Sequence, residues 1–173
     1  MTRFSTPLLL ALAVVLGAGA GIGGYFGWQA WAERGPEQRP EFTLPDLDGE
    51  ERNISEWDGK VVVLNFWGSW CPPCVHEIPM FVDLQDAYGD RGLQFVGVAV
   101  DRLADARRFH DELSMNYPSL IGVHDANEIG ERYGNELGTL PYTVIIDRDG
   151  FIVQKFAREV DRETLEPAIL PHL

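Results

Sequence analysis

Apolar residues along the chain follow two alternating patterns after residue 41. Residues 61–67 and 94–100 are almost unbroken apolar runs, which are typical of strands buried on both faces of a sheet. Residues 72–88 instead have apolar positions at helical spacing, and Gly89 marks the helix end. This alternation predicts an α/β fold with a mixed central sheet flanked by helices.

The remaining segments fit the same architecture. Asp149-Gly150 predicts a tight turn between the last two strands. The helix at residues 103–115 is expected to be amphipathic, with Leu103, Phe109 and Leu113 on its apolar face. The other predicted elements are a short strand at 42–44, a helical turn at 53–57, helices at 126–133 and 162–170, and strands at 118–123, 142–147 and 151–156.

The first part of the chain has a different pattern. Residues 8–28 are almost wholly apolar or glycine, and these 21 residues would form a helix of ~31 Å, which matches the thickness of a bilayer core. Aromatic residues at 25, 28 and 31 suit a membrane interface. We therefore predict one transmembrane signal anchor at residues 1–32, an exposed linker at 33–41 and a folded domain at 42–173.

A cleaved signal peptide is the alternative interpretation of this segment, because Ala30-Trp31-Ala32 has the form of a cleavage site. The apolar run is longer than the usual h-region of ~7–15 residues, which favours an uncleaved anchor. The flanking charges do not decide which side of the membrane the folded domain occupies, since Arg3 lies before the apolar run and Arg34 and Arg39 lie after it.

The charge balance excludes one class of partner. The formal net charge is −13, from 27 acidic and 14 basic residues, and the lysines are limited to Lys60 and Lys155. Binding to nucleic acid needs clustered cationic side chains facing phosphates. No nucleic-acid partner is expected.

The 2 cysteines of the chain lie together in Cys71-Pro72-Pro73-Cys74. A disulfide-stapled domain would carry more cysteines, and a structural zinc site needs four ligands, so no metal is expected. Cys71 stands at the predicted start of a helix, where free N–H groups and the helix dipole favour a thiolate. The pattern predicts a redox-active Cys71–Cys74 disulfide with no other cofactor, in which Cys71 is an exposed attacking thiol and Cys74 resolves the mixed disulfide.

Glu77 lies one helical turn after Cys74, on the same face. A partly buried carboxyl group there would have a raised pKa and could accept the proton of Cys74. An ordinary solvated carboxylate is the alternative. Asn65, on the preceding strand, does not titrate and cannot share this role, and His76 is expected to be exposed.

These motifs together resemble the TlpA/ResA-like, membrane-anchored branch of the thioredoxin superfamily over residues ~41–172. The matching segments are residues 42–49, 59–67, 70–79, Leu140-Pro141 and 145–150. The resemblance implies a thioredoxin fold with an N-terminal extension and an αβ insertion within residues 94–125. It also implies that Asn65 replaces the buried Asp of thioredoxin, and that Glu77 serves instead.

The resemblance further implies that Pro141 is a cis-proline facing the cysteines and that the backbone of Leu140 pairs with substrate. Trp70, Pro72 and Pro73 are the other expected substrate-contacting residues. Such proteins commonly act outside the cytoplasmic membrane as reductants supplied by a membrane thiol donor, many of them on apocytochrome c. The sequence around Pro141 departs from the Gly-Ala-Pro-Glu type of the cytochrome-maturation subgroup, so the client stays open.

Other activities on a related fold fit the sequence less well. A peroxidase of the peroxiredoxin type needs a Pro-x-x-x-Thr/Ser-x-x-Cys loop, and residues 67–70 supply no such proline. A copper chaperone uses C-x-x-x-C with a distal histidine, for which His124 is the candidate, but the spacing here is one residue short. A general thiol oxidase or isomerase remains an alternative, because the sequence does not set the direction of electron flow.

Overall fold

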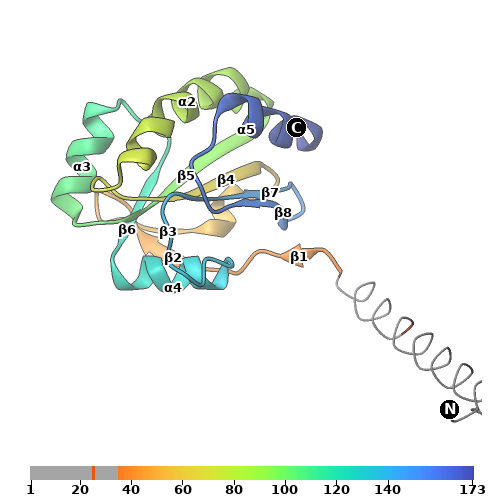
Figure 1. The fold of residues 1–173 in the computed structure, drawn as a ribbon, viewed down its shortest axis with the longest axis horizontal. Coiled ribbons are helices and arrows are strands. Elements are labelled where there is room, and N and C mark those ends of the chain that lie inside the picture. The colour runs from red at the N-terminus through yellow and green to blue at the C-terminus, as the bar shows by residue number, and fades with distance from the viewer. Residues whose placement is uncertain (1–24, 26–34) are drawn as a thin grey trace, which may run out of the picture. The chain divides into compact units, whose positions relative to one another are not determined.

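A six-stranded mixed sheet forms the middle layer of the domain (Figure 1). The computed structural model describes Tyr25 and residues 35–173. The strand order is β1-β8-β7-β4-β5-β6, in which β4, β5 and β6 are parallel and the others antiparallel to their neighbours. The strands are β1 (Glu37–Gln38), β4 (Val61–Trp67), β5 (Leu93–Val100), β6 (Ser119–Gly122), β7 (Tyr142–Ile146) and β8 (Phe151–Phe156). This mixed sheet is the predicted architecture.

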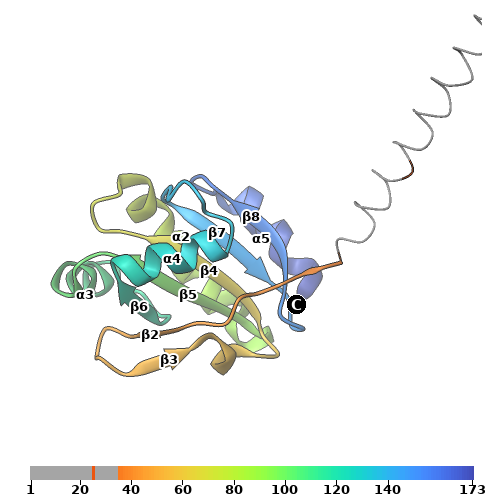
Figure 2. The same ribbon diagram turned by 90° about the horizontal axis from the view of Figure 1, so that it is seen from below.

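Helices cover both faces of the sheet. The helices on one face are α2 (Pro72–Tyr88), α3 (Leu103–Glu112) and α5 (Arg162–Ile169) (Figure 1). The opposite face is covered by α4 (His124–Arg132) and by a small hairpin of β2 (Thr43–Pro45) and β3 (Glu51–Asn53) (Figure 2). Short 3-10 turns are η1 (Ile54–Trp57), η2 (Gly89–Arg91) and η3 (Leu170–His172). Helix α2 has the predicted bounds, and α3 with β6 falls where the resemblance placed the insertion.

Strand β4 is buried on both faces, which explains its unbroken apolar sequence. Val61 and Val63 pack in the cluster beneath α2, α3 and α5, whereas Val62 and Leu64 pack in the cluster beneath α4 and the hairpin. Asn65 has the same parity as Val63, so the one polar side chain of β4 lies on the α2 face.

Two expectations about the fold differ from the structure. Glu37 and Gln38 pair with Ile152 and Phe151 of β8, and Arg39 is buried, so part of the expected exposed linker joins the sheet. The backbone N–H of Arg39 donates to Gly150 O over 2.9 Å, and its guanidinium pairs with Glu41 and Asp58, which is how a charged residue is accommodated there.

The other difference concerns α3, where Leu103 is exposed rather than part of the apolar face. The fully buried residue of α3 is Ala106, and Phe109 and Leu113 pack partly against the same cluster. Leu103 is the first residue of the helix, and the chain leaves the sheet there. Apart from Tyr25, the predicted transmembrane anchor lies outside the described residues, among which no helix is long and apolar enough to cross a membrane.

Replacing Gly97 with alanine is expected to destabilise the domain. A Cβ at Gly97 would lie 2.9 Å from both Ser119 Oγ and Trp67 Nε1, and both side chains are buried. Overpacking of this kind costs ~1–3 kcal/mol, which chemical denaturation of the full-length chain measures. Gly35→Ala is the control, since nothing lies within 4 Å of its Cβ position. Equal stability of the two variants would contradict the tight packing at Gly97.

Candidate active site

The disulfide lies where β4 passes into α2. Cys71 is the N-cap residue of α2, with extended backbone, and its Sγ is bonded to that of Cys74 in the first turn. The loop that delivers it is closed by the N–H of Cys71, which donates to Gly68 O over 3.1 Å. Cys71 was expected to be exposed, but it is only 4% exposed in this oxidised form. Its sulfur is bonded to buried Cys74, and both belong to the cluster against which Leu140 packs.

The start of α2 explains how the Cys71 sulfur can carry a negative charge. Pro72 and Pro73 occupy the first two helical positions and have no N–H group. The first amide of the helix is therefore that of Cys74, which donates to Cys71 Sγ over 3.3 Å. A sulfur in this N-cap position faces the positive end of the helix dipole. This arrangement favours the Cys71 thiolate once the disulfide is opened.

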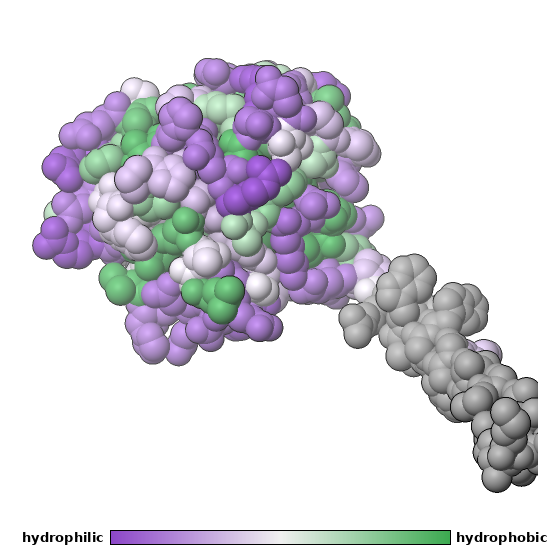
Figure 3. All heavy atoms as spheres, in the orientation of Figure 1, coloured by the Kyte–Doolittle hydropathy of each residue, from purple (hydrophilic) through white to green (hydrophobic). Residues whose placement is uncertain are grey.

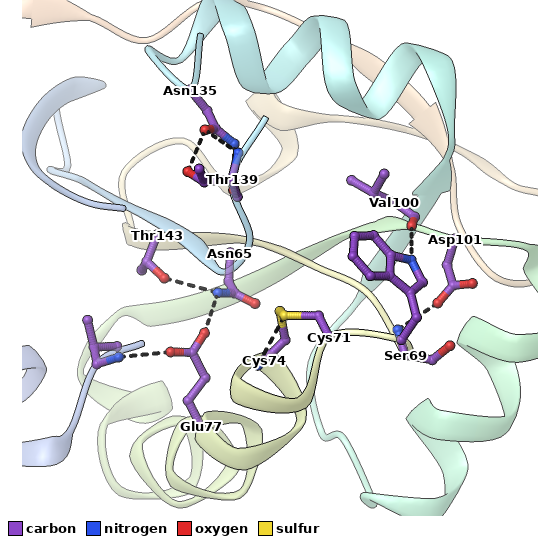
Figure 4. The surroundings of a disulfide bond; sticks show 12 residues. Asn65, Ser69, Cys71, Cys74, Glu77, Val100, Asp101, Asn135, Thr139 and Thr143 are labelled. Carbon is purple, nitrogen blue, oxygen red and sulfur yellow. Dashed lines mark hydrogen bonds between the residues drawn. A yellow bond between two sulfur atoms is a disulfide. The ribbon is translucent and has the colours of Figure 1, made fainter. Parts of the chain in front are cut away.

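Asp101 fixes the loop that precedes the disulfide (Figure 4). Its buried carboxylate accepts from the N–H of Ser69 over 2.6 Å and from that of Arg102 over 2.8 Å. The indole of Trp70 donates to Val100 O over 3.0 Å, yet the side chain stays exposed. The end of β5 thus holds the loop while Trp70 remains available at the surface beside Cys71.

The predicted cis bond is present between Leu140 and Pro141. The loop before it is organised by buried Asn135, whose Oδ1 accepts from the backbone N–H and the hydroxyl of Thr139, each over 3.0 Å. The amide group of Asn135 donates in turn to Thr139 O over 2.9 Å. Leu140 packs against both core clusters, one of which contains Cys71 and Cys74. That Pro141 faces the cysteines and that Leu140 pairs with substrate stay predictions.

Glu77 lies behind the disulfide and is almost completely buried (Figure 4). Its Oε1 accepts from Asn65 Nδ2 over 2.9 Å, and its Oε2 accepts from the N–H of Val160 over 3.0 Å. Asn65 Nδ2 also donates over 3.0 Å to the hydroxyl of Thr143, its cross-strand partner on β7. The carboxyl group is therefore held between α2, the sheet and the segment before α5.

Burial is the main cause of the altered acidity of Glu77. Desolvation raises its pKa from 4.5 to about 8, against the two N–H donors of Val160 and Asn65, which lower it. The nearby charge of Glu159 adds a smaller upward effect. A carboxyl group with this pKa is close to an ordinary thiol in acidity, so it can exchange a proton with Cys74 in either direction.

Glu159 is expected to help keep Glu77 protonated. Its carboxylate lies 2.5 Å from His76 Nδ1 on α2, and the next residue, Val160, is the one bonded to Glu77. Removing this charge in Glu159→Gln should lower the pKa of Glu77 below its value of about 8. NMR titration of the Glu77 carboxyl carbon in the oxidised protein measures this shift.

Glu163→Gln is the matched control for this titration, because Glu163 is an exposed carboxylate in the first turn of α5. Its removal should leave the Glu77 midpoint unchanged. An unchanged midpoint in Glu159→Gln as well would show that burial alone sets the acidity of Glu77.

Several of the predicted site residues lie close together along the chain, and the structure adds others. Cys74 and Glu77 lie in α2 with Cys71 as its N-cap, the bond before Pro141 is cis, and His76 is exposed as expected. The residues that sequence reasoning missed are those that position the site: Thr143, Val160, Asp101 and Asn135. Three of them act through a side chain from a distant segment, and Val160 acts through its backbone, which no motif could reveal.

Comparison with known proteins indicates the same reaction class as this geometry. The model of the AhpC/TSA family matches residues 36–155. The thiol-disulfide oxidoreductase ResA of Bacillus cereus is 33% identical over 144 residues, which cover 83% of this chain and 80% of the relative. ResA of Geobacillus kaustophilus is 33% identical over 128 residues, covering 73% of this chain and 71% of the relative.

A crystal structure from Chlorobium tepidum, described as a thiol:disulfide interchange protein DsbE, has the same fold. It superposes with a TM-score of 0.73 at 29% identity, over 79% of this chain and 96% of the other. With a cysteine pair closed into a disulfide at the start of α2, the chain belongs to the AhpC/TSA family and, within its thioredoxin-like members, is a thiol–disulfide oxidoreductase of the ResA type.

Proposed function

We propose that this enzyme reduces disulfides in client proteins outside the cytoplasmic membrane. The observation that carries the proposal is the pairing of the Cys71–Cys74 disulfide with a buried carboxyl group, Glu77, one helical turn behind it. The names of the relatives support the reaction class. The direction of electron flow is the part that the proposal adds.

In the reductive half of the cycle, the thiolate of Cys71 attacks one sulfur of the client disulfide. A Cys71–client disulfide forms, and the other client sulfur leaves as a thiolate that takes a proton from solvent. Glu77 then accepts the proton of Cys74, whose thiolate attacks Cys71 Sγ. The Cys71–Cys74 disulfide forms, and the second client sulfur leaves with the bonding electron pair as a thiolate, which takes a proton from solvent.

The disulfide must then be reduced by a thiol donor, which we place in the membrane. The donor thiolate attacks Cys71 Sγ, and Cys74 leaves as a thiolate that Glu77, protonated at neutral pH, supplies with a proton. Attachment of the enzyme to the same membrane would keep the two partners close. The apolar run at residues 8–28 supports a single-pass anchor in the inner membrane. We place the domain in the periplasm, because disulfides of client proteins form and persist in that compartment.

Apocytochrome c is the client we favour, and trapping tests it. In a Cys74→Ala variant expressed in the native host, Cys71 can attack a client but cannot be released. We expect a covalent adduct that is sensitive to reductant and contains apocytochrome c, identified by mass spectrometry. The double variant Cys71→Ala/Cys74→Ala should trap nothing. Adducts that lack apocytochrome c would refute the maturation role and leave the reductase activity standing.

The midpoint potential of the Cys71–Cys74 couple separates a reductase from a general oxidase or isomerase. A reductase should equilibrate with glutathione or dithiothreitol at a potential near that of thioredoxin, about −270 mV. A potential near that of a strong oxidant, about −120 mV, would overturn the reductase assignment.

A further inference from the structure

A row of cross-strand partners crosses the sheet beneath α2. Asn65 of β4 pairs with Thr143 of β7 on one side and with Gly97 of β5 on the other. Gly97 pairs in turn with Ser119 of β6, the last strand of the sheet. Direct partners on neighbouring strands share a face, so the whole row lies on the face where Asn65 binds Glu77 (Figure 4). The row therefore runs from the partners of the Glu77 carboxyl group to the edge of the sheet at β6.

Two polar side chains converge above Gly97. Trp67 Nε1 and Ser119 Oγ each lie 2.9 Å from the position that a Cβ of Gly97 would occupy. Both atoms are buried and have no hydrogen-bond partner in the part of the chain that the structure describes. Buried polar groups are nearly always bonded, either to protein or to ordered water. One water molecule, with two hydrogen bonds of about 2.9 Å each, would span such a pair.

The hydroxyl of Tyr117 is a third buried group of this kind. It too has no hydrogen-bond partner among the described residues. Its ring packs on Phe95, which has the same parity on β5 as Gly97, so the two side chains share the α2 face. Burial and, to a smaller extent, the charge of Glu77 raise the pKa of this hydroxyl. Tyr117 is thus close enough to Glu77 to be affected by its charge.

Tyr117 and Ser119 also line a pocket of about 620 Å³, which lies among α3, the start of β6 and the loop that joins β2 to β3. Asp48 and Asp111 line the same pocket and are exposed, so it is open to solvent. Hydrophilic side chains predominate on the surface over α3, which forms one wall of the pocket (Figure 3). The unpartnered groups therefore lie between the surroundings of Glu77 and a pocket that water can enter.

We propose that these three side chains bind water within the core, and that this water carries protons between Glu77 and the pocket. The inference rests on the proposed function, in which Glu77 accepts the proton of Cys74. Glu77, with a pKa of about 8, is mostly protonated at neutral pH and must lose its own proton first, although it is only 2% exposed. One proton passes from the carboxyl group to the water and one leaves the water at the pocket, so the bound water is unchanged.

Ser119→Val and Ser119→Thr form a matched pair that tests for the bound water. The two side chains add the same bulk to β6, but only threonine keeps the hydroxyl. In the oxidised full-length wild type we expect a direct rotating-frame NMR cross-peak between the indole N–H of Trp67 and water. Trp67 is completely buried, so surface water cannot give this signal. The cross-peak should persist in Ser119→Thr and disappear in Ser119→Val.

The rate at which Glu77 exchanges its proton tests the route itself. At a pH of about 8 the protonated and ionised forms are equally populated, and fast exchange merges their carboxyl carbon signals into one. We expect one averaged signal in wild type and in Ser119→Thr. The signal should broaden or split in Ser119→Val, with an exchange rate about 10-fold lower, the effect of one lost hydrogen bond. The titration midpoint should stay unchanged, because neither variant touches Glu77.

Tyr117→Phe is a second test, which removes one oxygen and adds no bulk. A hydroxyl bonded to water contributes a hydrogen bond, so its loss should lower the midpoint of chemical denaturation and slow proton exchange at Glu77. An unchanged or higher midpoint would show that the hydroxyl is unsatisfied in the folded state, which contradicts the water site.

Other outcomes would overturn the route. A wild type without the cross-peak would do so, and equal exchange rates in wild type and Ser119→Val would assign the proton to a path past Cys74. An equal loss in Ser119→Thr would attribute the effect to packing rather than to the hydroxyl. All of these leave the proposed function standing, which fails on a different result, namely that the reduced wild type does not reduce oxidised glutathione or a client disulfide.

Discussion

Glu77→Gln is expected to slow the resolving step by about 10²–10⁴-fold, because that step needs a proton acceptor next to Cys74. The substitution keeps the shape of the side chain, and the Asn65 amide can turn to offer its oxygen to the new amide group. The first attack by Cys71, which does not use Glu77, should keep its rate. Stopped-flow measurement of adduct formation and decay separates the two steps.

The pH dependence of this resolving step identifies the group involved. With the pKa of Glu77 at about 8, the wild-type rate should rise with pH up to that value and then level off, since the carboxylate is the active form. Glu77→Gln should lose this inflection. A variant that resolves as fast as wild type at pH 7 would assign the proton to solvent and reduce Glu77 to a structural role.

The same group makes stability depend on pH. The pKa of Glu77 is about 8 in the folded state, above its ordinary value of 4.5, so the folded state binds this proton more tightly than the unfolded state does. Its contribution is fully present below about pH 4.5 and is lost as pH rises through 8. The difference in unfolding free energy between oxidised wild type and oxidised Glu77→Gln should therefore change by roughly a few kcal/mol between pH 4.5 and pH 8.

Cys74→Ala is expected to abolish turnover while leaving one exchange intact. The reduced variant should attack a small chromogenic disulfide and release one equivalent of thiol, because Cys71 keeps its position at the N-terminus of α2. The amide of residue 74 that donates to Cys71 Sγ belongs to the backbone and survives the substitution. Steady-state activity should fall below detection, and the enzyme should accumulate as the mixed disulfide.

Cys71→Ala is the matched control for this experiment. The remaining thiol of Cys74 is completely buried, so it should release no thiol from the probe on the same timescale. Rapid attack by Cys74 in this variant would reverse the assignment of the two cysteines. Both variants lack the disulfide, so a difference between them cannot arise from its loss.

The local elements were predictable because their signals are local. The apolar run of β4 and the helical spacing of α2 gave both elements the bounds found in the structure. The order of cysteines, prolines and Glu77 along α2 gave the core of the site, because residues three or four apart in a helix share a face whatever surrounds them. The resemblance added the cis bond at Pro141, which the residues alone could not supply.

Strand β1 and the exposed position of Leu103 were not predictable in this way. Glu37 and Gln38 have no strand pattern, and they are extended because the edge of β8 offers hydrogen bonds to them. Leu103 fits an apolar helical face by spacing, but Ala106 makes the buried contact. In both cases the environment supplied by other segments outweighed a weak local signal.

The sequence by itself indicated the reaction class, because the 2 cysteines of the chain stand as one C-x-x-C pair at a helix start after a buried strand, which favours redox chemistry over a zinc site with four ligands. The tertiary structure decided the environment of those residues. It placed Glu77 between Asn65 and Val160, raised its pKa to about 8 by burial, and brought Thr143 of β7 to the same amide of Asn65. Burial and these long-range contacts depend on how distant segments pack, and this is information that no single stretch of sequence contains.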